Sequence, residues 1–290
     1  MIKIALCLYG QWRASDDNLH NLHEWFRKGK LVESIDVFAS IKDFNTFNTT
    51  PVSKQQRQEF ADKHQLTKPW TKKEIWTKIT DAGLDLKSLR MHNESFDQQT
   101  MHNVNHCGVV YNTMIDSVQQ KQLYEIENDI VYDLVFLTRG DVNPKGPKYG
   151  NYLKNWLWSL GLQNENNEVV QDATKLKHIL DDFGYSIWIS QVKMHKHLDP
   201  QPEAWFEFHR CWSDLWIAGS SLAIDAFTST AMQMSSSQHS FNRVASHIDS
   251  HFSLELIRKQ SGLQFNDWSK LPDILNGQDN LDRLNPEVIR

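Results

Sequence analysis

Short apolar runs separated by polar or amphipathic stretches set the pattern of this chain. The clearest runs cover residues 2–8, 35–40, 134–138 and 215–219, and they are rich in β-branched and aromatic side chains. Such runs are typical of parallel strands that are buried on both faces. Helical periodicity in several of the intervening stretches completes the alternation, which predicts the α/β class with a mostly parallel central sheet.

The longest amphipathic stretch, 109–128, leads into the run at 134–138. Its stripe of Val110, Met114, Val118 and Leu123 predicts a helix that buries this face. The pattern predicts further strands at 187–189 and 263–268, and further helices at 15–25, 53–64, 71–79, 176–183, 222–232 and 251–259. Because no internal repeat or low-complexity segment divides the chain, we expect a single domain over residues 1–290.

Composition and charge argue against several classes of protein. The net charge of −5 disfavours a general nucleic-acid binder, which normally presents a basic surface. No stretch approaches the roughly eighteen apolar residues of a membrane span. Cys7, Cys107 and Cys211 lack any C-x-x-C spacing, so neither a disulfide framework nor a zinc ribbon is predicted. Without a signal-peptide pattern, we expect a reducing cytoplasm, the host's if a virus encodes the chain.

Polar residues follow the first predicted strand where it ends. Gly10 permits a tight turn and a close approach of a ligand to the backbone, and Gln11 and Arg13 supply hydrogen-bond donors. Tyr9 and Trp12 are placed to stack on the base of a nucleotide or to line its binding site. Aromatic side chains at strand ends also commonly pack in the core, which is the alternative. Neither G-x-G-x-x-G nor G-x-x-x-x-G-K-[ST] is present, so neither a dinucleotide fingerprint nor a P-loop is predicted.

The run at 134–138 also ends in charged residues, in the sequence Thr138-Arg139-Gly140-Asp141. Ligands of open α/β sheets bind at the carboxyl ends of the strands. Arg139 can grip a phosphate with two parallel hydrogen bonds, and Asp141 can hold Mg²⁺ or Mn²⁺, which favour carboxylate and phosphate oxygens. The alternative is a surface ion pair that ends a strand. We therefore predict a site for a phosphate and its metal at this edge.

Four blocks of sequence, in order, carry a resemblance to known proteins. They are residues 4–13 (IALCLYGQWR), 36–38 (DVF), 132–141 (YDLVFLTRGD) and 213–220 (SDLWIAGS). In their order and spacing they resemble a group of glycosyltransferase-like proteins of bacteria and large viruses. Those proteins have the GT-A fold of the nucleotide-diphospho-sugar transferases.

This resemblance implies a GT-A-like, Rossmann-type sheet and a sugar transferase with a nucleotide-sugar donor, such as a UDP- or GDP-sugar, and a saccharide or other small acceptor. About 1–145 would bind the nucleotide-sugar, and about 146–290 would bind the acceptor and form a C-terminal tail. The residues that it places at the nucleotide-sugar are Tyr9, Gly10, Gln11, Arg13, Arg139, Asp141 and Trp216.

The metal motif departs from the group's pattern. The usual Asp-x-Asp reads Arg139-Gly140-Asp141 here. Mn²⁺ or Mg²⁺ would then be held by Asp141 together with the diphosphate, and His251 falls where a late His often completes the metal site. Alternatively, Arg139 replaces the charge of the metal, Arg13 assists it, and no metal is required.

Asp214, in the fourth block, is the candidate catalytic residue. In an inverting transfer a carboxylate accepts the proton of the acceptor hydroxyl, and Asp214 can act as this base or bind hydroxyls of the donor sugar. A turn or cap role is the structural alternative. Two other functions stay open. One is a nucleotide-sugar or polysaccharide-binding protein without transfer activity, which Arg139 favours. The other is a metal-independent phosphoryl or nucleotidyl transferase on a related fold.

Overall fold

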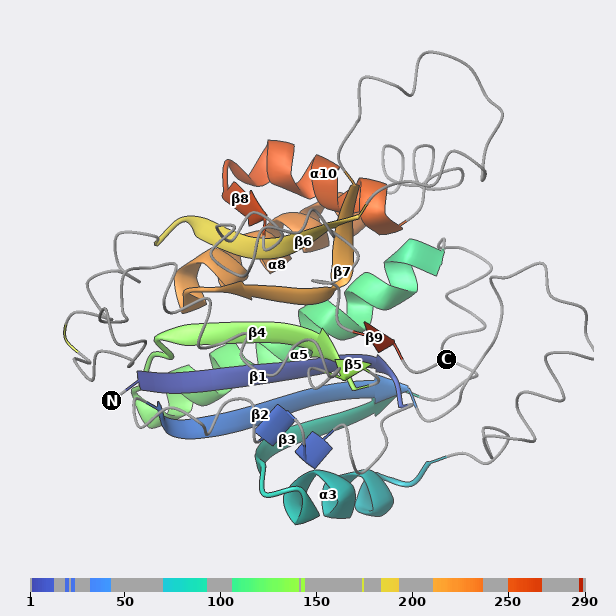
Figure 1. Ribbon diagram of the computed structural model, residues 1–290, viewed down its shortest axis with the longest axis vertical. Helices are drawn as coiled ribbons and strands as arrows, with labels where there is room; N and C mark the ends of the chain where they lie inside the picture. The colour runs from blue at the N-terminus through green and yellow to red at the C-terminus, as the bar shows by residue number, and fades with distance from the viewer. Residues whose placement is uncertain are drawn as a thin grey trace, which may run out of the picture.

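One sheet of seven strands forms the centre of the fold (Figure 1). The computed structural model describes residues 2–12, 19–20, 22–23, 32–42, 70–92, 106–140, 142–143, 174, 184–192, 211–236, 250–267 and 287–288. The strands of the sheet are β1 (Ile2–Gln11), β2 (Val32–Lys42), β3 (Asp85–His92), β4 (Leu134–Arg139), β6 (Ser186–Val192), β7 (Cys211–Gly219) and β8 (Gln264–Asp267). The helices are α3 (Lys72–Asp81), α5 (His106–Asn128), α8 (Ser221–Ser236) and α10 (Ser250–Ser261), and β5 (Val142–Asn143) pairs separately with β9 (Glu287–Val288).

The strand order is β3-β2-β1-β4-β7-β6-β8, and β7 alone is reversed among these described strands. β1 pairs in parallel with both β2 and β4, which confirms that the first, second and 134–138 runs are neighbouring strands. The α/β class with a mostly parallel sheet is likewise confirmed. The chain goes outward from β1 to β2 and β3 and then returns to the other side of β1, so the strand order reverses between β1 and β4.

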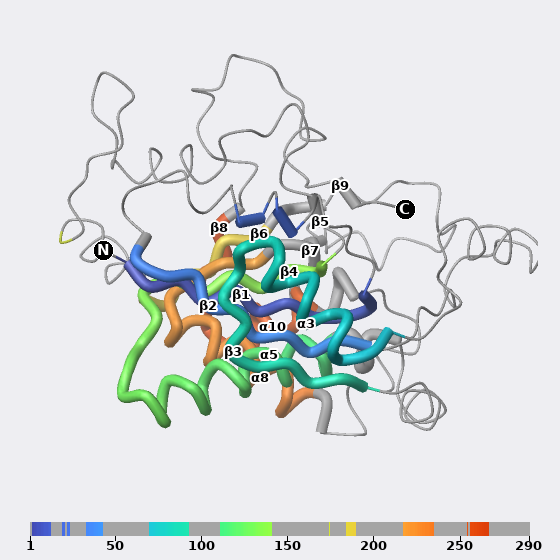
Figure 2. The backbone as a smooth tube through the Cα atoms, turned by 90° about the horizontal axis from the view of Figure 1, so that it is seen from below, coloured from blue at the N-terminus to red at the C-terminus, as the bar shows by residue number. Residues whose placement is uncertain are grey.

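Alternating side chains of β1 contribute to an apolar layer on each face of the sheet. Ile4, Leu6 and Leu8 belong to the layer that contains α3, whereas Cys7 and Tyr9 belong to the layer of α5, α8 and α10. All five are fully buried. Figure 2 shows α5 and α8 together on one side of the strands. The period-two alternation of a strand that is covered on both faces therefore explains the continuous apolar run of β1.

A buried lysine ties α5 to α8. The Nζ atom of Lys121 lies 2.8 Å from Glu125 Oε2 and 2.8 Å from Asp225 Oδ1, and it donates to Ser221 Oγ. Glu125 Oε1 in turn accepts hydrogen bonds from Tyr132 N at 2.8 Å and from Ser221 Oγ at 2.9 Å. Burial raises the pKa of Asp225, although the charge of Lys121 opposes this effect. Because each buried charge has a partner, the cluster specifies how the two helices dock.

Two features differ from the pattern prediction. The pattern does not predict β3, because its buried leucines, Leu86 and Leu89, are three residues apart rather than two, and the strand lies at the edge of the sheet. Leu123, expected in the buried stripe of its helix, is 54% exposed. In this part of α5 the core-facing positions are instead occupied by Lys121 and Glu125, whose charges the cluster pairs.

Most other predicted elements that fall on described residues are present, with bounds that differ by a few positions. The predicted helices at 53–64 and 176–183 lie wholly outside the described residues. Of the predicted helix at 15–25, the structure describes only residues 19–20 and 22–23, which are helical. Within the described ranges, no helix combines the length and the apolar character needed to cross a membrane.

Candidate functional site

The carboxyl ends of β1 and β4 meet where the strand order reverses. Tyr9 and Arg139 are partners in the register of these two parallel strands. Gly10 has a φ of 90°, and a Cβ added to it would lie 3.9 Å from Arg139 Cγ. The side chain of Arg139 thus lies beside Gly10. In open α/β sheets this reversal point is where a crevice for ligands forms.

The register of the parallel strands aligns one residue from each of β4, β1, β2 and β3 along this edge of the sheet. Arg139 pairs with Tyr9, Tyr9 with Ser40, and Ser40 with Arg90. Residues in one such row point to the same face, and here it is the face of α5, because Leu137, two residues before Arg139, belongs to that layer. At about 5 Å between neighbouring strands, the two arginines stand about 15 Å apart along the edge.

Asp116 of α5 lies at the centre of a cluster of polar side chains beside β2 and β3. Arg90 Nη1 donates to Asp116 Oδ1, and His92 Nε2 lies 3.4 Å from Asp116 Oδ2 and 2.8 Å from Ser40 Oγ. Burial raises the pKa of Asp116, but hydrogen bonds from His92 and Ser40 and the charge of Arg90 outweigh it and hold the pKa below its ordinary value. Asp116 therefore stays ionised and anchors the carboxyl ends of β2 and β3 to α5.

Sequence reasoning does not identify this cluster. Arg90 and His92 stand in a strand that the pattern does not predict, and Asp116 lies in the middle of an amphipathic helix. The only signal in the sequence is that Asp116 interrupts an otherwise buried helical stretch.

Tyr9 and Trp12, the two aromatic candidates, are both fully buried. Tyr9 packs in the layer of α5, and Trp12 packs in the layer of α3. Within the described part of the chain, Trp12 Nε1 has no hydrogen-bond partner. Their described contacts are those of core aromatics, so neither ring presents an open face for stacking on a base. Gln11, the last residue of β1, is partly exposed at the edge.

The backbone of β7 brings two further candidates to this edge. Trp216 pairs with Thr138, and β7 runs against β4. Asp214 precedes Trp216 by two residues, so its backbone lies beyond this pair, on the side where β4 ends at Arg139. The structure describes the backbone of these two residues and not their side chains.

His251 is the second residue of α10. This helix ends shortly before β8 begins, and β8 is parallel to β6. The helix therefore runs back along the sheet, and its first turn lies towards the carboxyl ends of β1, β2 and β4 (Figure 1). The backbone of His251 is thus on the same side of the molecule as Arg139, and its side chain is not described.

Arg13 and Asp141 lie outside the described residues. Among the side chains that the structure describes, no three His, Cys, Asp or Glu groups come together as a metal site. The described charge nearest the reversal point is the cation Arg139, and the carboxylate of Asp116 is already engaged by Arg90 and His92. The described residues therefore do not by themselves fit Mn²⁺ or Mg²⁺, and the predicted metal ligands Asp141 and His251 stay predictions.

Comparison with known proteins adds no assignment. No model of a protein family matches this chain, and no curated protein matches it.

Proposed function

We propose that this protein is a glycosyltransferase of the GT-A type, which moves a sugar from a UDP- or GDP-sugar to a saccharide or other small acceptor. The observation that carries the proposal is the position of Arg139 beside Gly10 at the point where the strand order reverses. Ligands of open α/β sheets bind at this point of the sheet. A guanidinium that is positioned there by strand register suits a diphosphate, because its planar fork binds two oxygens at once.

The chemistry needs positive charge at this position. During transfer, the bond between the anomeric carbon and the diphosphate oxygen breaks, and the acceptor oxygen bonds to the same carbon. The leaving nucleoside diphosphate keeps the electron pair, so Arg139, assisted by Arg13, stabilises the growing negative charge. Asp214 takes the proton of the acceptor hydroxyl. Asp141 and His251 are the residues that would hold a divalent metal, which would supply further positive charge near the leaving diphosphate.

Turnover of donor sugars tests the proposal. The protein is incubated with UDP-glucose, UDP-galactose, UDP-N-acetylglucosamine and GDP-mannose, with Mn²⁺ or with excess chelator, and nucleoside diphosphate release is followed. We expect release from at least one donor, and faster release when a saccharide acceptor is added. Asp214→Asn should lose transfer and still bind nucleoside diphosphate. If no donor is turned over under any of these conditions, transferase activity is excluded for this panel of donors.

A binding protein without transfer activity is the second candidate. Arg139 favours it, because this cation stands where the resemblance leads us to expect a carboxylate of the metal motif. Saturable binding of a nucleotide-sugar without release of nucleoside diphosphate would identify this function. Release of inorganic diphosphate would instead identify a nucleotidyl transferase.

A further inference from the structure

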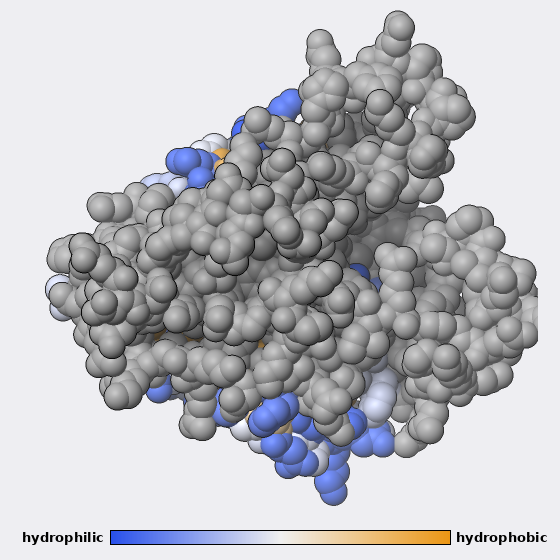
Figure 3. Space-filling view, in the orientation of Figure 1, coloured by the Kyte–Doolittle hydropathy of each residue, from blue (hydrophilic) through white to orange (hydrophobic). Residues whose placement is uncertain are grey.

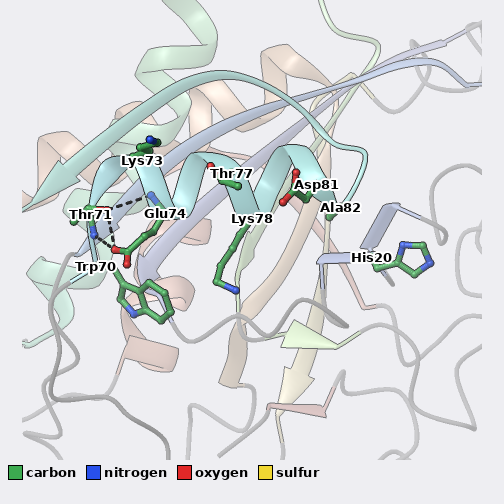
Figure 4. Close-up of a pocket in the computed structure, with 9 residues that line it drawn as sticks. All are labelled: His20, Trp70, Thr71, Lys73, Glu74, Thr77, Lys78, Asp81 and Ala82. Atoms are coloured by element: carbon green, nitrogen blue, oxygen red, sulfur yellow. Dashed lines mark hydrogen bonds between the residues drawn. The ribbon is translucent and has the colours of Figure 1, made fainter.

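A groove runs along α3, away from the site described above. It has a volume of about 700 Å³, within the range of small-molecule sites. Figure 4 shows Trp70 at the N-terminal end of the helix, Lys78 extending to the same side, and His20 beyond Ala82 at the other end. The groove therefore follows the helix, whose ten residues span about 15 Å.

Local contacts make both ends of the groove rigid. At the N-terminal end of α3, Thr71 Oγ1 accepts a hydrogen bond from Glu74 N at 3.2 Å, and Glu74 Oε2 accepts one from Thr71 N at 2.8 Å. The neighbouring Trp70 packs against the apolar layer of α3. At the other end, the ring of His23 lies so close to Gly83 that a Cβ there would be 3.2 Å from it. The walls of the groove are thus held in place without a ligand.

The side chains that line the groove include the aromatic ring of Trp70 and charged groups of both signs. Lys78 Nζ lies 5.9 Å from the centroid of the Trp70 ring. Lys73 and Lys78 stand among Glu74 and Asp81, so the groove carries no excess of one charge. Figure 3 shows hydrophilic side chains along the lower margin of the molecule, where α3 lies. A balanced set of donors and acceptors beside an indole suits a polyhydroxyl ligand, whose C–H faces pack on the ring.

Within the residues that the structure describes, Trp70 Nε1 is buried and has no hydrogen-bond partner, so the part of Trp70 that can meet a ligand is the ring. α3 begins at its end nearest the carboxyl ends of β1 and β2 (Figure 1), and Trp70 comes two residues before its first residue, Lys72. The groove thus begins near the carboxyl edge of the sheet, but on the face of α3, opposite to the face of α5 that Arg139 shares.

We propose that the groove along α3 binds a linear, uncharged saccharide. This inference stands on the groove alone and does not depend on the proposed function.

Calorimetry with cellohexaose, maltohexaose and chitohexaose, in the absence of any nucleotide, tests this inference. We expect at least one of them to bind, and Trp70→Ala to weaken that binding about tenfold or more. Trp76→Ala is the matched control, because Trp76 is on the same helix, is 40% exposed and does not line the groove. Thr77→Arg fills the groove from an exposed helical position, and it should abolish binding while the fold is kept.

The salt dependence distinguishes an uncharged ligand from a charged one. Affinity should change less than about twofold between about 0.1 M and about 1 M salt, because the Debye length falls from about 10 Å to about 3 Å over this range. The inference is wrong if none of the three saccharides binds, if Thr77→Arg leaves binding intact, or if only polyanions such as heparin bind. Because nucleoside diphosphate binding at Arg139 is measured separately, failure of the groove and failure of the proposed function can be told apart.

Discussion

Arg139 lies opposite Tyr9 in the last pair of residues that β4 and β1 share, and its Cγ atom would lie 3.9 Å from a Cβ added to Gly10. Both strands are buried on both faces, so the register fixes the base of the arginine side chain rigidly. A charge that is placed by a sheet rather than by a loop needs little reorganisation to meet a ligand. This relationship is the physical basis of the candidate diphosphate site.

Gly10→Ala should lower the free energy of unfolding and weaken nucleoside diphosphate binding. Its φ of 90° is strained for any residue with a Cβ, at a cost of about 1–2 kcal/mol, and relief of this strain would move the backbone beneath Arg139. Gly262→Ala is the control, because Gly262 has a φ of 67°, no atom of the described residues within 4 Å of its added Cβ, and no part in the site. Urea unfolding should show that both variants are destabilised. Calorimetry should show that only Gly10→Ala binds nucleoside diphosphate more weakly than the parent. Similar losses of affinity in both would contradict the role of Gly10.

Asp116→Asn should destabilise the protein at neutral pH by about 1.5–3 kcal/mol, because it removes charged hydrogen bonds to Arg90 and His92. The folded-state pKa of Asp116 lies below its unfolded value of about 3.9. Its contribution is therefore fully present above about pH 4 and is lost as pH falls through the folded-state pKa. Unfolding free energies measured against pH should show an acid loss in the parent that is smaller in the variant.

The exposed Asp85 provides the control for this titration. Its carboxylate is 63% exposed and pairs with Lys87, so Asp85→Asn should change the free energy of unfolding by no more than about 1 kcal/mol. If Asp116→Asn behaves like Asp85→Asn across the pH range, Asp116 does not anchor the edge of the sheet.

Lys121→Met should destabilise the protein by about 3–5 kcal/mol, because it leaves the carboxylates of Glu125 and Asp225 near each other without their cation. Adding Glu125→Gln and Asp225→Asn to this variant should recover part of the loss. Lys72→Met, at an exposed position in the first turn of α3, should have little effect. Thermal and urea unfolding of the three variants measure these changes in the free energy of unfolding. A Lys121→Met protein as stable as the parent would show that the cluster contributes little to stability.

Cys7 should resist alkylation in the folded protein. Burial raises the pKa of its thiol to about 12, against the lowering effect of the nearby Lys121 charge. The thiolate is the reacting species, so almost none is present at about pH 8, and the side chain is also inaccessible. Peptide mapping after iodoacetamide treatment should find Cys7 modified only when denaturant is present. Rapid modification of Cys7 in the native protein would show that this layer of the core opens.

The parallel strands could be predicted because each apolar run is buried on both faces. Apart from Lys3 near the start of the first run and Thr138 at the end of the second, residues 2–8 and 134–138 are apolar, and so they indicate strands without any alignment. The end of each run then locates Gly10 and Arg139 at one edge. Their contact follows from the parallel pairing of β1 with β4, which the structure shows.

The cluster around Asp116 could not be predicted, because it depends on register rather than on pattern. Ser40, Arg90 and His92 meet only because β2 and β3 pair with one particular alignment and α5 crosses them. The sequence left two roles open for Tyr9, and the layer of α5 that covers its face of the sheet decides for the core.

Calorimetric titration with UDP and with GDP, with and without Mn²⁺, tests the diphosphate site most directly. Arg139→Lys keeps the charge but lacks the planar fork, so it should weaken binding about tenfold or more while the thermal unfolding midpoint stays nearly constant. Arg258→Lys, the same change in the last turn of α10 far from the carboxyl edge, is the control and should bind like the parent. The proposal predicts saturable binding that Arg139→Lys alone impairs. Equal affinity in all three proteins, or no binding of either nucleotide, would contradict it.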